Sequence, residues 1–238
     1  MNREEAVLRE LNLYPLWKRR EQVAPVAEAA PVLQPVQTEV KSEDAPVKNR
    51  EQTIVELAWP ELKTAVRDCT ACKLRAGCTQ TVFGVGDEKA DWLFVGEGPG
   101  ADEDAQGEPF VGQAGKLLDN MLLAIKLKRG KNVYIGNIVK CRPPGNRTPE
   151  ADEIAACLPY LQRQIALIQP KIIVALGKTA ANALLESDVT LSSLRGRLHD
   201  YRGIPLIITY HPAYLLRTPA DKAKAWQDLC LAEKTLEG

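Results

Sequence analysis

The sequence predicts an α/β fold built on a mostly parallel β-sheet with helices on both faces. Short, continuously apolar runs recur along the chain, and such runs are typical of parallel strands buried on both faces. Helical segments separate these runs, so crossover connections are expected to join neighbouring strands. The expected strands are residues 92–96, 133–139, 171–177 and 205–211, and the expected helices between them are residues 115–127, 149–168 and 178–186.

The chain upstream of these strands divides into three expected parts. Residues 1–21 form a short amphipathic segment, broken at Pro15, that either binds a protein partner through residues 3–20 or packs on the main domain. Residues 22–51 are rich in Ala, Val and Pro and hold no aromatic residue, which predicts a disordered linker. Residues 52–238 are the expected globular domain, which opens with a helix over residues 54–66.

Composition excludes some classes of protein and leaves others open. No apolar run approaches the roughly 18 residues of a membrane span, and the N-terminus lacks the apolar stretch of a secretory signal. We therefore expect a cytoplasmic protein that makes no membrane contact, and we expect a monomer. Lys+Arg and Asp+Glu both total 31, so a nucleic-acid site would have to be a local patch made by the fold.

Four of the six cysteines are candidate metal ligands. Disulfides are rare in the reducing cytosol, so clustered cysteines there indicate metal or redox chemistry. Cys69 and Cys72 form a C-x-x-C turn, Cys141 ends a predicted strand, and Cys157 lies in the helix predicted after it. The loop between Cys141 and Cys157 doubles back and would bring them together. Four thiolates suit either zinc or an iron–sulfur cluster, and the spacing does not choose between them.

Cys157 and the two remaining cysteines, Cys78 and Cys230, also have interpretations that involve no metal. Cys157 itself is equally explained as a buried helix cysteine. Its helix is predicted to open with Thr148 as N-cap and Pro149 at the first helical position. Cys78 follows Cys72 at a looser spacing and Cys230 lies far along the chain, so both are expected to be ordinary thiols.

A glycine-rich stretch follows the first strand, and its parts are the glycine-rich runs 96–100 and 107–115. Glycines at a strand end allow a ligand to approach the backbone closely. The stretch lacks the G-x-G-x-x-G pattern, and the acids at 102–104 would repel phosphates, which disfavours a dinucleotide site. Phe110 within it is either a core residue or a face on which a planar base stacks.

Polar residues stand at the carboxyl ends of two later strands, where ligands bind in parallel sheets. Asn137 interrupts an apolar run, so its amide must be hydrogen-bonded or point into a site. His211 follows the last strand and is either a turn residue or part of that site. Leu215 and Leu216 beside Arg217 indicate either the start of a helix or an apolar wedge next to a phosphate anchor.

Three long motifs and the C-x-x-C turn closely resemble the family 4 uracil-DNA glycosylases. The motifs are GEGPGADEDAQGEPFVGQAG, NIVKCRPPGNRTP and TYHPAYLLR, and the resemblance covers about residues 65–232. It implies a three-layer α/β/α sandwich around a four-stranded parallel sheet. It also implies a hydrolase that flips uracil out of DNA, cuts its N-glycosidic bond and leaves an abasic site, which initiates base excision repair.

The resemblance assigns a [4Fe–4S] cluster to Cys69, Cys72, Cys141 and Cys157. The cluster is implied to be structural, ordering loops next to the DNA.

The resemblance further implies a role for each residue of the site. Phe110 stacks on uracil, Asn137 reads its O4 and N3–H edge, and His211 donates to O2. Glu103 lines the C5 side, where thymine carries its methyl group. Glu97 and Gly98 belong to the water-activating loop; Gly98 stands where the better-known family 1 enzymes have an aspartate, so no general base is assigned. The implied DNA contacts are Arg195, Arg197, Leu215, Leu216 and Arg217.

Three alternatives stay open at this point. A sister group bonds covalently to DNA through a histidine in a basic insertion, and His199 lies near arginines here, in a predicted loop without the longer insertion. The chain would then be a covalent uracil-DNA binding protein, or a non-catalytic one with a structural cluster. A glycosylase for other deaminated bases is the alternative among enzymes.

Overall fold

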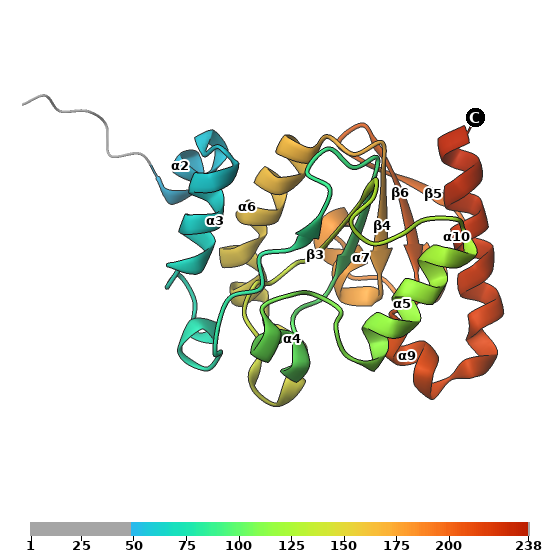
Figure 1. The fold of residues 1–238 in the computed structure, drawn as a ribbon, viewed down its shortest axis with the longest axis horizontal. Coiled ribbons are helices and arrows are strands. Elements are labelled where there is room, and N and C mark those ends of the chain that lie inside the picture. Colours follow the sequence, from blue (N-terminus) through green and yellow to red (C-terminus); the bar gives the residue numbers. More distant parts are fainter. Residues whose placement is uncertain (1–48, 238) are drawn as a thin grey trace, which may run out of the picture. The chain divides into compact units, whose positions relative to one another are not determined.

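The computed structural model describes residues 49–237, which build one α/β unit (Figure 1). The expectations for residues 1–21, and for the linker up to residue 48, lie outside the described part of the chain. The helices are α2 (Arg50–Glu56), α3 (Trp59–Arg67), α4 (Ala101–Gln106), α5 (Gln113–Ala124), α6 (Ala151–Ile168), α7 (Lys178–Leu185), α8 (Leu191–Leu194), α9 (Pro212–Arg217) and α10 (Lys222–Glu237), and the 3-10 turns are η1 (Lys73–Ala76), η2 (Pro144–Asn146) and η3 (Pro219–Asp221). The strands are β1 (Val85–Gly86), β2 (Trp92–Gly96), β3 (Val133–Asn137), β4 (Ile172–Leu176), β5 (Leu198–Tyr201) and β6 (Ile204–Thr209).

The six strands form one mixed sheet in the order β1-β3-β2-β4-β6-β5. The central four, β3, β2, β4 and β6, are parallel and are the four strands expected from the sequence. The edge strands β1 and β5 pair antiparallel with β3 and β6, and the sequence did not predict them. β1 has only two residues, and β5 (LHDY) is an exposed edge without apolar alternation. His199, expected in a loop, therefore lies on a strand.

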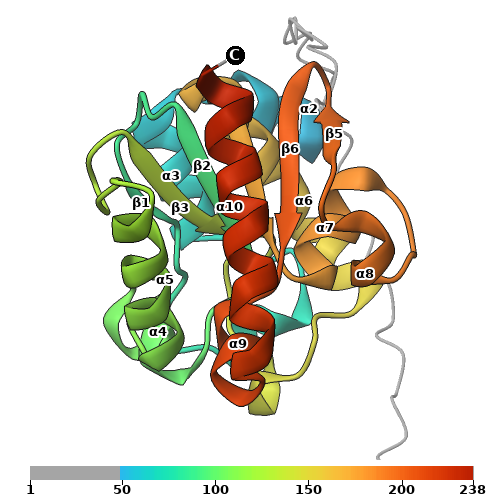
Figure 2. The same cartoon turned by 90° about the vertical axis from the view of Figure 1, so that its right-hand side faces the viewer.

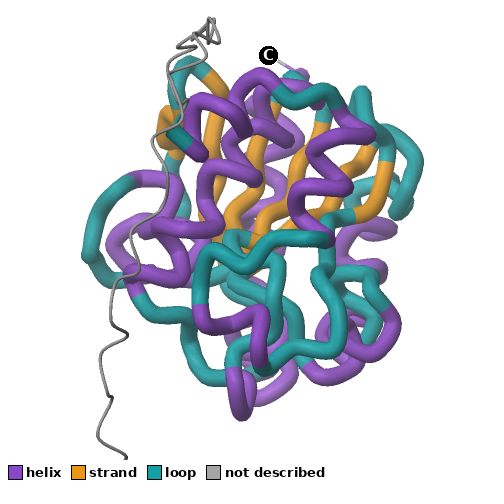
Figure 3. The backbone as a smooth tube through the Cα atoms, turned by 90° about the vertical axis from the view of Figure 1, so that its left-hand side faces the viewer, coloured by secondary structure: helices purple, strands orange, loops and turns teal. Residues whose placement is uncertain are grey.

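Side chains alternate along each strand between two apolar cores. Leu93, Tyr134 and Ile173 belong to the core under α2, α3, α6 and α7. Phe94 and Ile172 belong to the opposite core, under α5 and α10. Figure 2 shows α10 and α5 in front of the sheet, and Figure 3 views the opposite face. The expected three-layer α/β/α sandwich is confirmed.

Two predicted helix boundaries are wrong. The single helix expected over residues 54–66 is two helices, α2 and α3, because Pro60 cannot continue a helix and instead occupies the first turn of α3. The N-cap of α6 is Glu150 and not Thr148. The Glu153 carboxylate accepts the Glu150 backbone N–H at 2.7 Å, which starts the helix after Pro149.

The loops that follow the parallel strands gather at one end of the sheet (Figure 3). β2 ends at Gly96, β3 at Asn137, β4 at Leu176 and β6 at Thr209. Gly96 pairs with Asn137 in the register of β2 and β3, and Leu176 pairs with Thr209 in that of β4 and β6. Residues far apart in sequence are thus brought to one place. Between residues 49 and 237, no helix has the length and apolar character needed to cross a bilayer.

Candidate active site

A cleft of about 770 Å³ opens at the carboxyl ends of the parallel strands. Its walls come from the segments that follow β2, β3, β4 and β6, together with α9. The cleft brings together seven of the residues predicted for the site: Glu97, Gly98, Glu103, Phe110, Asn137, His211 and Arg217.

Asn137 places an unsatisfied acceptor in this cleft. It is the last residue of β3 and is 2% exposed, and within residues 49–237 its Oδ1 atom has no hydrogen-bond partner. A Cβ atom at Gly96 would lie 2.5 Å from both this oxygen and the Phe110 ring, so glycine is required under the pair. Leaving a buried acceptor unpaired costs about 1–3 kcal/mol, which a ligand with a matching donor would recover.

Phe110 is held in an unusual conformation at the cleft wall. Its φ angle is 56°, in the left-handed region that non-glycine residues rarely adopt. Arg129 donates to the carbonyls of Pro109 and Phe110 at 2.9 and 2.8 Å, which fixes this turn. The Phe110 ring stacks on the His211 imidazole, with centroids 5.5 Å apart and planes 29° apart. The surrounding contacts thus keep a flat aromatic face in the cleft.

His211 presents one defined donor. Its Nδ1 atom accepts the backbone N–H of Ala213 at 3.1 Å as it caps α9. A neutral imidazole with an accepting Nδ1 carries its proton on Nε2. Burial lowers the pKa of His211 to about 4, with a further lowering from Arg217 that Glu103 opposes. At neutral pH the side chain is therefore an uncharged Nε2–H donor.

Glu97 and Gly98 lie where β2 enters its loop. The Thr179 hydroxyl, from the start of α7, donates to Glu97 Oε2 and orients the carboxylate. A Cβ at Gly98 would come within 2.7 Å of the Val139 side chain, so the backbone passes close to the segment after β3.

The Glu103 carboxylate connects two parts of the glycine-rich stretch by accepting backbone hydrogen bonds from both. Oε2 accepts the Gly100 N–H at 3.0 Å, and Oε1 accepts the N–H groups of Val111 and Gly112 at 3.0 and 3.2 Å. Both oxygens are thus engaged by backbone donors on either side of α4. Glu103 lines the cleft as predicted, and it also sets the position of the turn that carries Phe110.

The predicted DNA-contacting residues are distributed unevenly. Arg217 lines the cleft, and Leu216 is 44% exposed beside it. Leu215 is 1% exposed and packs in the interior, so only its neighbour is available as a wedge. The Arg197 side chain is exposed, whereas that of Arg195 is 12% exposed and pairs with Asp228.

The cleft is also lined by residues to which the sequence analysis assigned no role in the site, among them Arg147, Lys178, Thr179 and Tyr214. Lys178 and Thr179 follow the end of β4, so the rule that located Asn137 and His211 would have found them. Arg147 lies in the loop between Cys141 and Cys157, which the sequence analysis used as a connection and as part of a family motif, without a role for Arg147 itself. Its guanidinium binds both Glu153 oxygens, at 2.7 and 2.8 Å.

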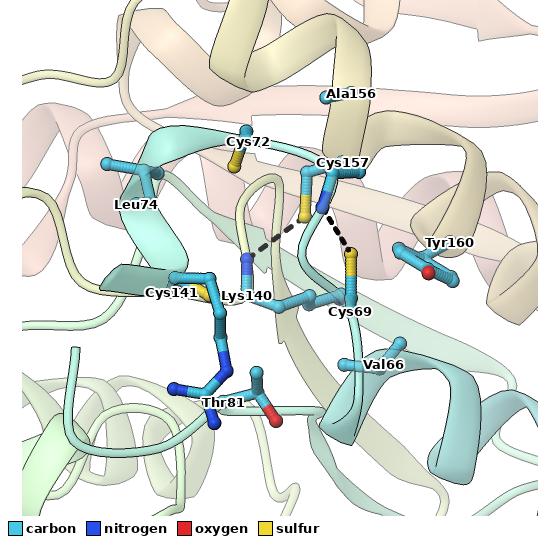
Figure 4. Close-up of a pocket in the computed structure, with 12 residues that line it drawn as sticks. Val66, Cys69, Cys72, Leu74, Thr81, Lys140, Cys141, Ala156, Cys157 and Tyr160 are labelled. Carbon is cyan, nitrogen blue, oxygen red and sulfur yellow. Dashed lines mark hydrogen bonds between the residues drawn. The ribbon is translucent and has the colours of Figure 1, made fainter. Parts of the chain in front are cut away.

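The four predicted cysteine ligands line a second pocket (Figure 4). Cys69 and Cys72 come from the loop between α3 and η1, Cys141 follows β3, and Cys157 lies on α6. Cys78 is buried but outside this pocket, where its side chain contacts that of Cys141. Cys230, on α10, does not line the pocket either. The convergence expected for Cys141 and Cys157 is confirmed.

The chemistry of this pocket suits thiolate ligands. Apolar side chains such as Val66 and Leu74 form much of its wall. Backbone N–H groups approach two sulfurs: Lys140 to Cys157 at 3.2 Å and Ala71 to Cys69 at 3.5 Å. Burial raises the pKa of the Cys157 thiol to about 11, so metal binding would have to displace its proton.

The four thiols line one common pocket. Among residues 49–237, no three His, Cys, Asp or Glu side chains are placed to share a single metal ion. A cluster of several irons presents a separate iron to each thiolate, so thiols placed in this way fit it.

Comparison with known proteins gives a consistent result. A model of the Uracil DNA glycosylase superfamily matches residues 83–230. A type-4 uracil-DNA glycosylase from Pyrobaculum aerophilum is 42% identical over 180 residues, which cover 72% of this chain and 91% of the relative. Type-4 enzymes from Archaeoglobus fulgidus and Thermotoga maritima are 44% and 45% identical, covering 65% and 67% of this chain and 81% and 83% of the relatives. With its fold and cleft residues, the chain belongs to the uracil-DNA glycosylase superfamily, within its type-4 group.

Proposed function

We propose that this protein is a monofunctional uracil-DNA glycosylase, a hydrolase that excises uracil from DNA at the first step of base excision repair. One observation carries the proposal: the cleft holds an aromatic face, an unsatisfied amide oxygen and a neutral imidazole donor, which come from three separate segments of the chain. A flipped uracil ring needs these three contacts, to its face, its N3–H edge and its O2.

Recognition of the base would rest on Phe110 and Asn137. Stacking on an aromatic ring contributes roughly 1–3 kcal/mol per base. Asn137 Oδ1 would accept uracil N3–H, and its amide N–H would donate to O4. Cytosine presents an acceptor at N3 and a donor at C4, so the same amide would reject it. The orphaned state of Oδ1 supports this role, since the base would supply the missing donor.

Catalysis would rest on charge. As the C1′–N1 bond breaks, negative charge moves onto uracil O2 and positive charge onto the sugar. The Nε2–H of His211 would donate to O2 and bind the transition state more strongly than the ground state. A neutral imidazole also carries no positive charge that would repel the developing cation on the sugar.

Glu97 would act on the sugar side of the bond. Its carboxylate, oriented by Thr179, would stabilise the positive sugar and hold the attacking water. Gly98 has no side chain that could bind the water, so the carboxylate of Glu97 would take this role. Glu103 would form the wall on the C5 side, and its three backbone donors would stop it from moving aside for a methyl group.

DNA binding would use the rim of the cleft. Leu216 would fill the gap left by the flipped base, and Arg217 would hold a phosphate. Leu215 would support this helix from inside. Arg197, whose side chain is exposed, would add a further phosphate contact.

A [4Fe–4S] cluster would be held by Cys69, Cys72, Cys141 and Cys157. When bound, it would supply structure and not chemistry, by joining the loop after α3, the segment after β3 and helix α6. We also propose that the protein is a cytoplasmic monomer that binds uracil-containing DNA, and that residues 3–20 bind a protein partner. The predicted boundary between linker and domain at residues 51 and 52 moves upstream, because α2 begins at Arg50; the linker is proposed to end before it and the glycosylase domain to begin with it.

The proposal is tested with protein purified anaerobically and an oligonucleotide that contains one uracil. Alkali cleavage reveals abasic sites, and a thymine-containing strand is the control. We expect cleavage at uracil alone. Asn137→Asp should lower the excision rate on the order of 10³-fold or more, because its carboxylate cannot donate to O4, while non-specific DNA binding persists.

Two other outcomes would overturn the proposal. Excision that survives Asn137→Asp would remove Asn137 from the site. Tight binding without excision would favour a uracil-DNA binding protein, and a covalent adduct lost in His199→Ala would identify the linking residue. His199 lies on β5, outside the residues that line the cleft, with Nε2 2.6 Å from the Leu194 carbonyl, which favours turnover.

A further inference from the structure

Arg195 is engaged inside the protein and not free for a ligand. Its Nε and Nη2 atoms bind Asp228 Oδ2 at 2.9 and 2.7 Å, and Nη2 also donates to the Lys224 carbonyl at 2.6 Å. Asp228 is 1% exposed, and its other oxygen accepts the Gly196 N–H at 3.2 Å. The guanidinium therefore joins the turn before β5 to helix α10.

The other side of the guanidinium covers an aromatic stack. The Arg195 Cζ atom lies 4.4 Å from the centre of the Tyr210 ring. Tyr210 stacks on Tyr214 with centroids 4.9 Å apart and planes 18° apart. The Tyr214 hydroxyl donates to Asp221 at 2.7 Å, at the end of η3. A continuous column thus runs from Asp228 through Arg195 and two tyrosines to Asp221.

This column spans the turn that carries His211. Tyr210 precedes His211 directly, and Tyr214 lies in the first turn of α9, which His211 caps. The two rings therefore fix the backbone on both sides of the imidazole. His211 also stacks on Phe110. The Phe110–His211 and Tyr210–Tyr214 stacks together restrict the direction in which the Nε2–H of His211 points.

We propose that Arg195 is a positioning residue for His211, acting through the Tyr210–Tyr214 stack, and is not a contact to DNA phosphate. This inference rests on the proposed function and revises the role that family resemblance implies for Arg195. If Arg195 turned toward a phosphate, the Asp228 carboxylate would stay buried without its cation, which is strongly unfavourable. The Arg195 guanidinium would also lose its cation–π contact with the Tyr210 ring.

The test compares Arg195→Gln with Arg197→Gln, its exposed neighbour two positions along. The first measurement is single-turnover excision on a uracil-containing duplex at saturating protein. We expect Arg195→Gln to lower this rate by at least about tenfold, because catalysis falls steeply when a donor is displaced by about 1 Å. Tyr210→Phe keeps the ring and should retain the wild-type rate, whereas Tyr210→Ala should behave like Arg195→Gln.

The second measurement separates positioning from phosphate binding. Loss of one phosphate contact reduces the slope of log binding constant against log salt concentration by about one. Undamaged duplex is the probe. We expect an unchanged slope for Arg195→Gln and a reduced slope for Arg197→Gln.

The third measurement follows the imidazole itself. The chain has two histidines, so ring ¹H–¹⁵N spectra can be assigned to His211 with His199 as the internal reference. Arg195→Gln should shift or broaden the His211 Nε2–H signal, and Arg197→Gln should not. A salt slope reduced by about one in Arg195→Gln, with its excision rate and the His211 signal unchanged, would overturn the inference. If wild-type protein failed to excise uracil, the proposed function would fail, while the imidazole spectra would still test the positioning.

Discussion

The cleft and the cysteine pocket lie at the two ends of one short segment, residues 137–141, yet they are held in different ways. In the cleft the chain itself fixes each functional group: Arg129 holds the turn at Phe110, and a backbone N–H sets the tautomer of His211. In the pocket, thiols from three separate segments face a common space between apolar walls. The cleft is therefore preorganised by the chain, whereas in the pocket the proposed cluster would be the group that joins the three segments.

Of the variants that compare the cleft with the cysteine pocket, His211→Ala should produce the largest effect. His211→Ala removes the proposed hydrogen bond to uracil O2, and loss of one such donor lowers catalytic rates by about 10²–10³-fold. Single-turnover excision at saturating protein measures this loss. DNA affinity should change little, since the imidazole stacks on Phe110 and contacts no phosphate; equal losses in rate and in affinity for undamaged DNA would contradict the assignment.

The same residue gives a pH dependence with a defined sign. The folded-state pKa of His211, about 4, lies below its ordinary value of 6.5 because burial disfavours the cation. The folded state therefore binds this proton less readily than the unfolded state, and stability should fall as pH drops from about 6.5 to about 4. Over this pH range, protonation of His211 should lower the free energy of unfolding by roughly 3 kcal/mol. Urea unfolding of wild type and His211→Ala across this range measures it, and the variant should show a smaller fall.

Removing a cysteine ligand from the pocket should lower both the free energy of unfolding and the iron–sulfur absorbance. Cys157→Ser removes one of the four proposed ligands from helix α6. We expect loss of the iron–sulfur absorbance and of bound iron, with a decrease in stability on the order of a few kcal/mol, because metal binding contributes to folding free energy. Cys230→Ser, on α10 and outside the pocket, is the matched control and should stay brown. An unchanged spectrum in Cys157→Ser would instead move the fourth ligand to Cys78.

Lys140 contacts both Asn137 of the cleft and Cys157 of the cysteine pocket, so a variant at this position can affect one region and not the other. Its backbone N–H donates to Cys157, while its buried ammonium donates to the Asn137 carbonyl at 2.9 Å and to Gln164 Oε1 at 2.7 Å. Lys140→Met keeps the first contact and removes the other two. We expect about 1–3 kcal/mol of destabilisation and slower excision, because Asn137 loses its support, with iron content unchanged. The exposed Lys128→Met is the control, and iron loss in Lys140→Met would show that the ammonium supports the pocket instead.

The sequence predicted those parts of the fold whose signal is local. The four central strands are continuous apolar runs, and the site residues Asn137 and His211 follow directly from strand ends. β5 was missed because an exposed edge strand carries polar side chains, and the split between α2 and α3 was missed although Pro60 marked it. The partner of Arg195 lies 33 residues away on α10, so no local pattern could show that its charge is already neutralised.

The smallest effect should come from the apolar tip of α9. Leu216 is 44% exposed and directly precedes Arg217, which lines the cleft, and Leu216→Ala should cost little stability. A wedge replaces stacking that only a duplex provides, so we expect excision from double-stranded DNA to fall by up to about tenfold and excision from single strands to change less. Leu215→Ala is the contrasting variant, because its side chain is buried: it should destabilise the protein by about 2–5 kcal/mol. Equal losses on both substrates for Leu216→Ala would mean that Leu216 acts on the cleft itself and not on the gap in the duplex.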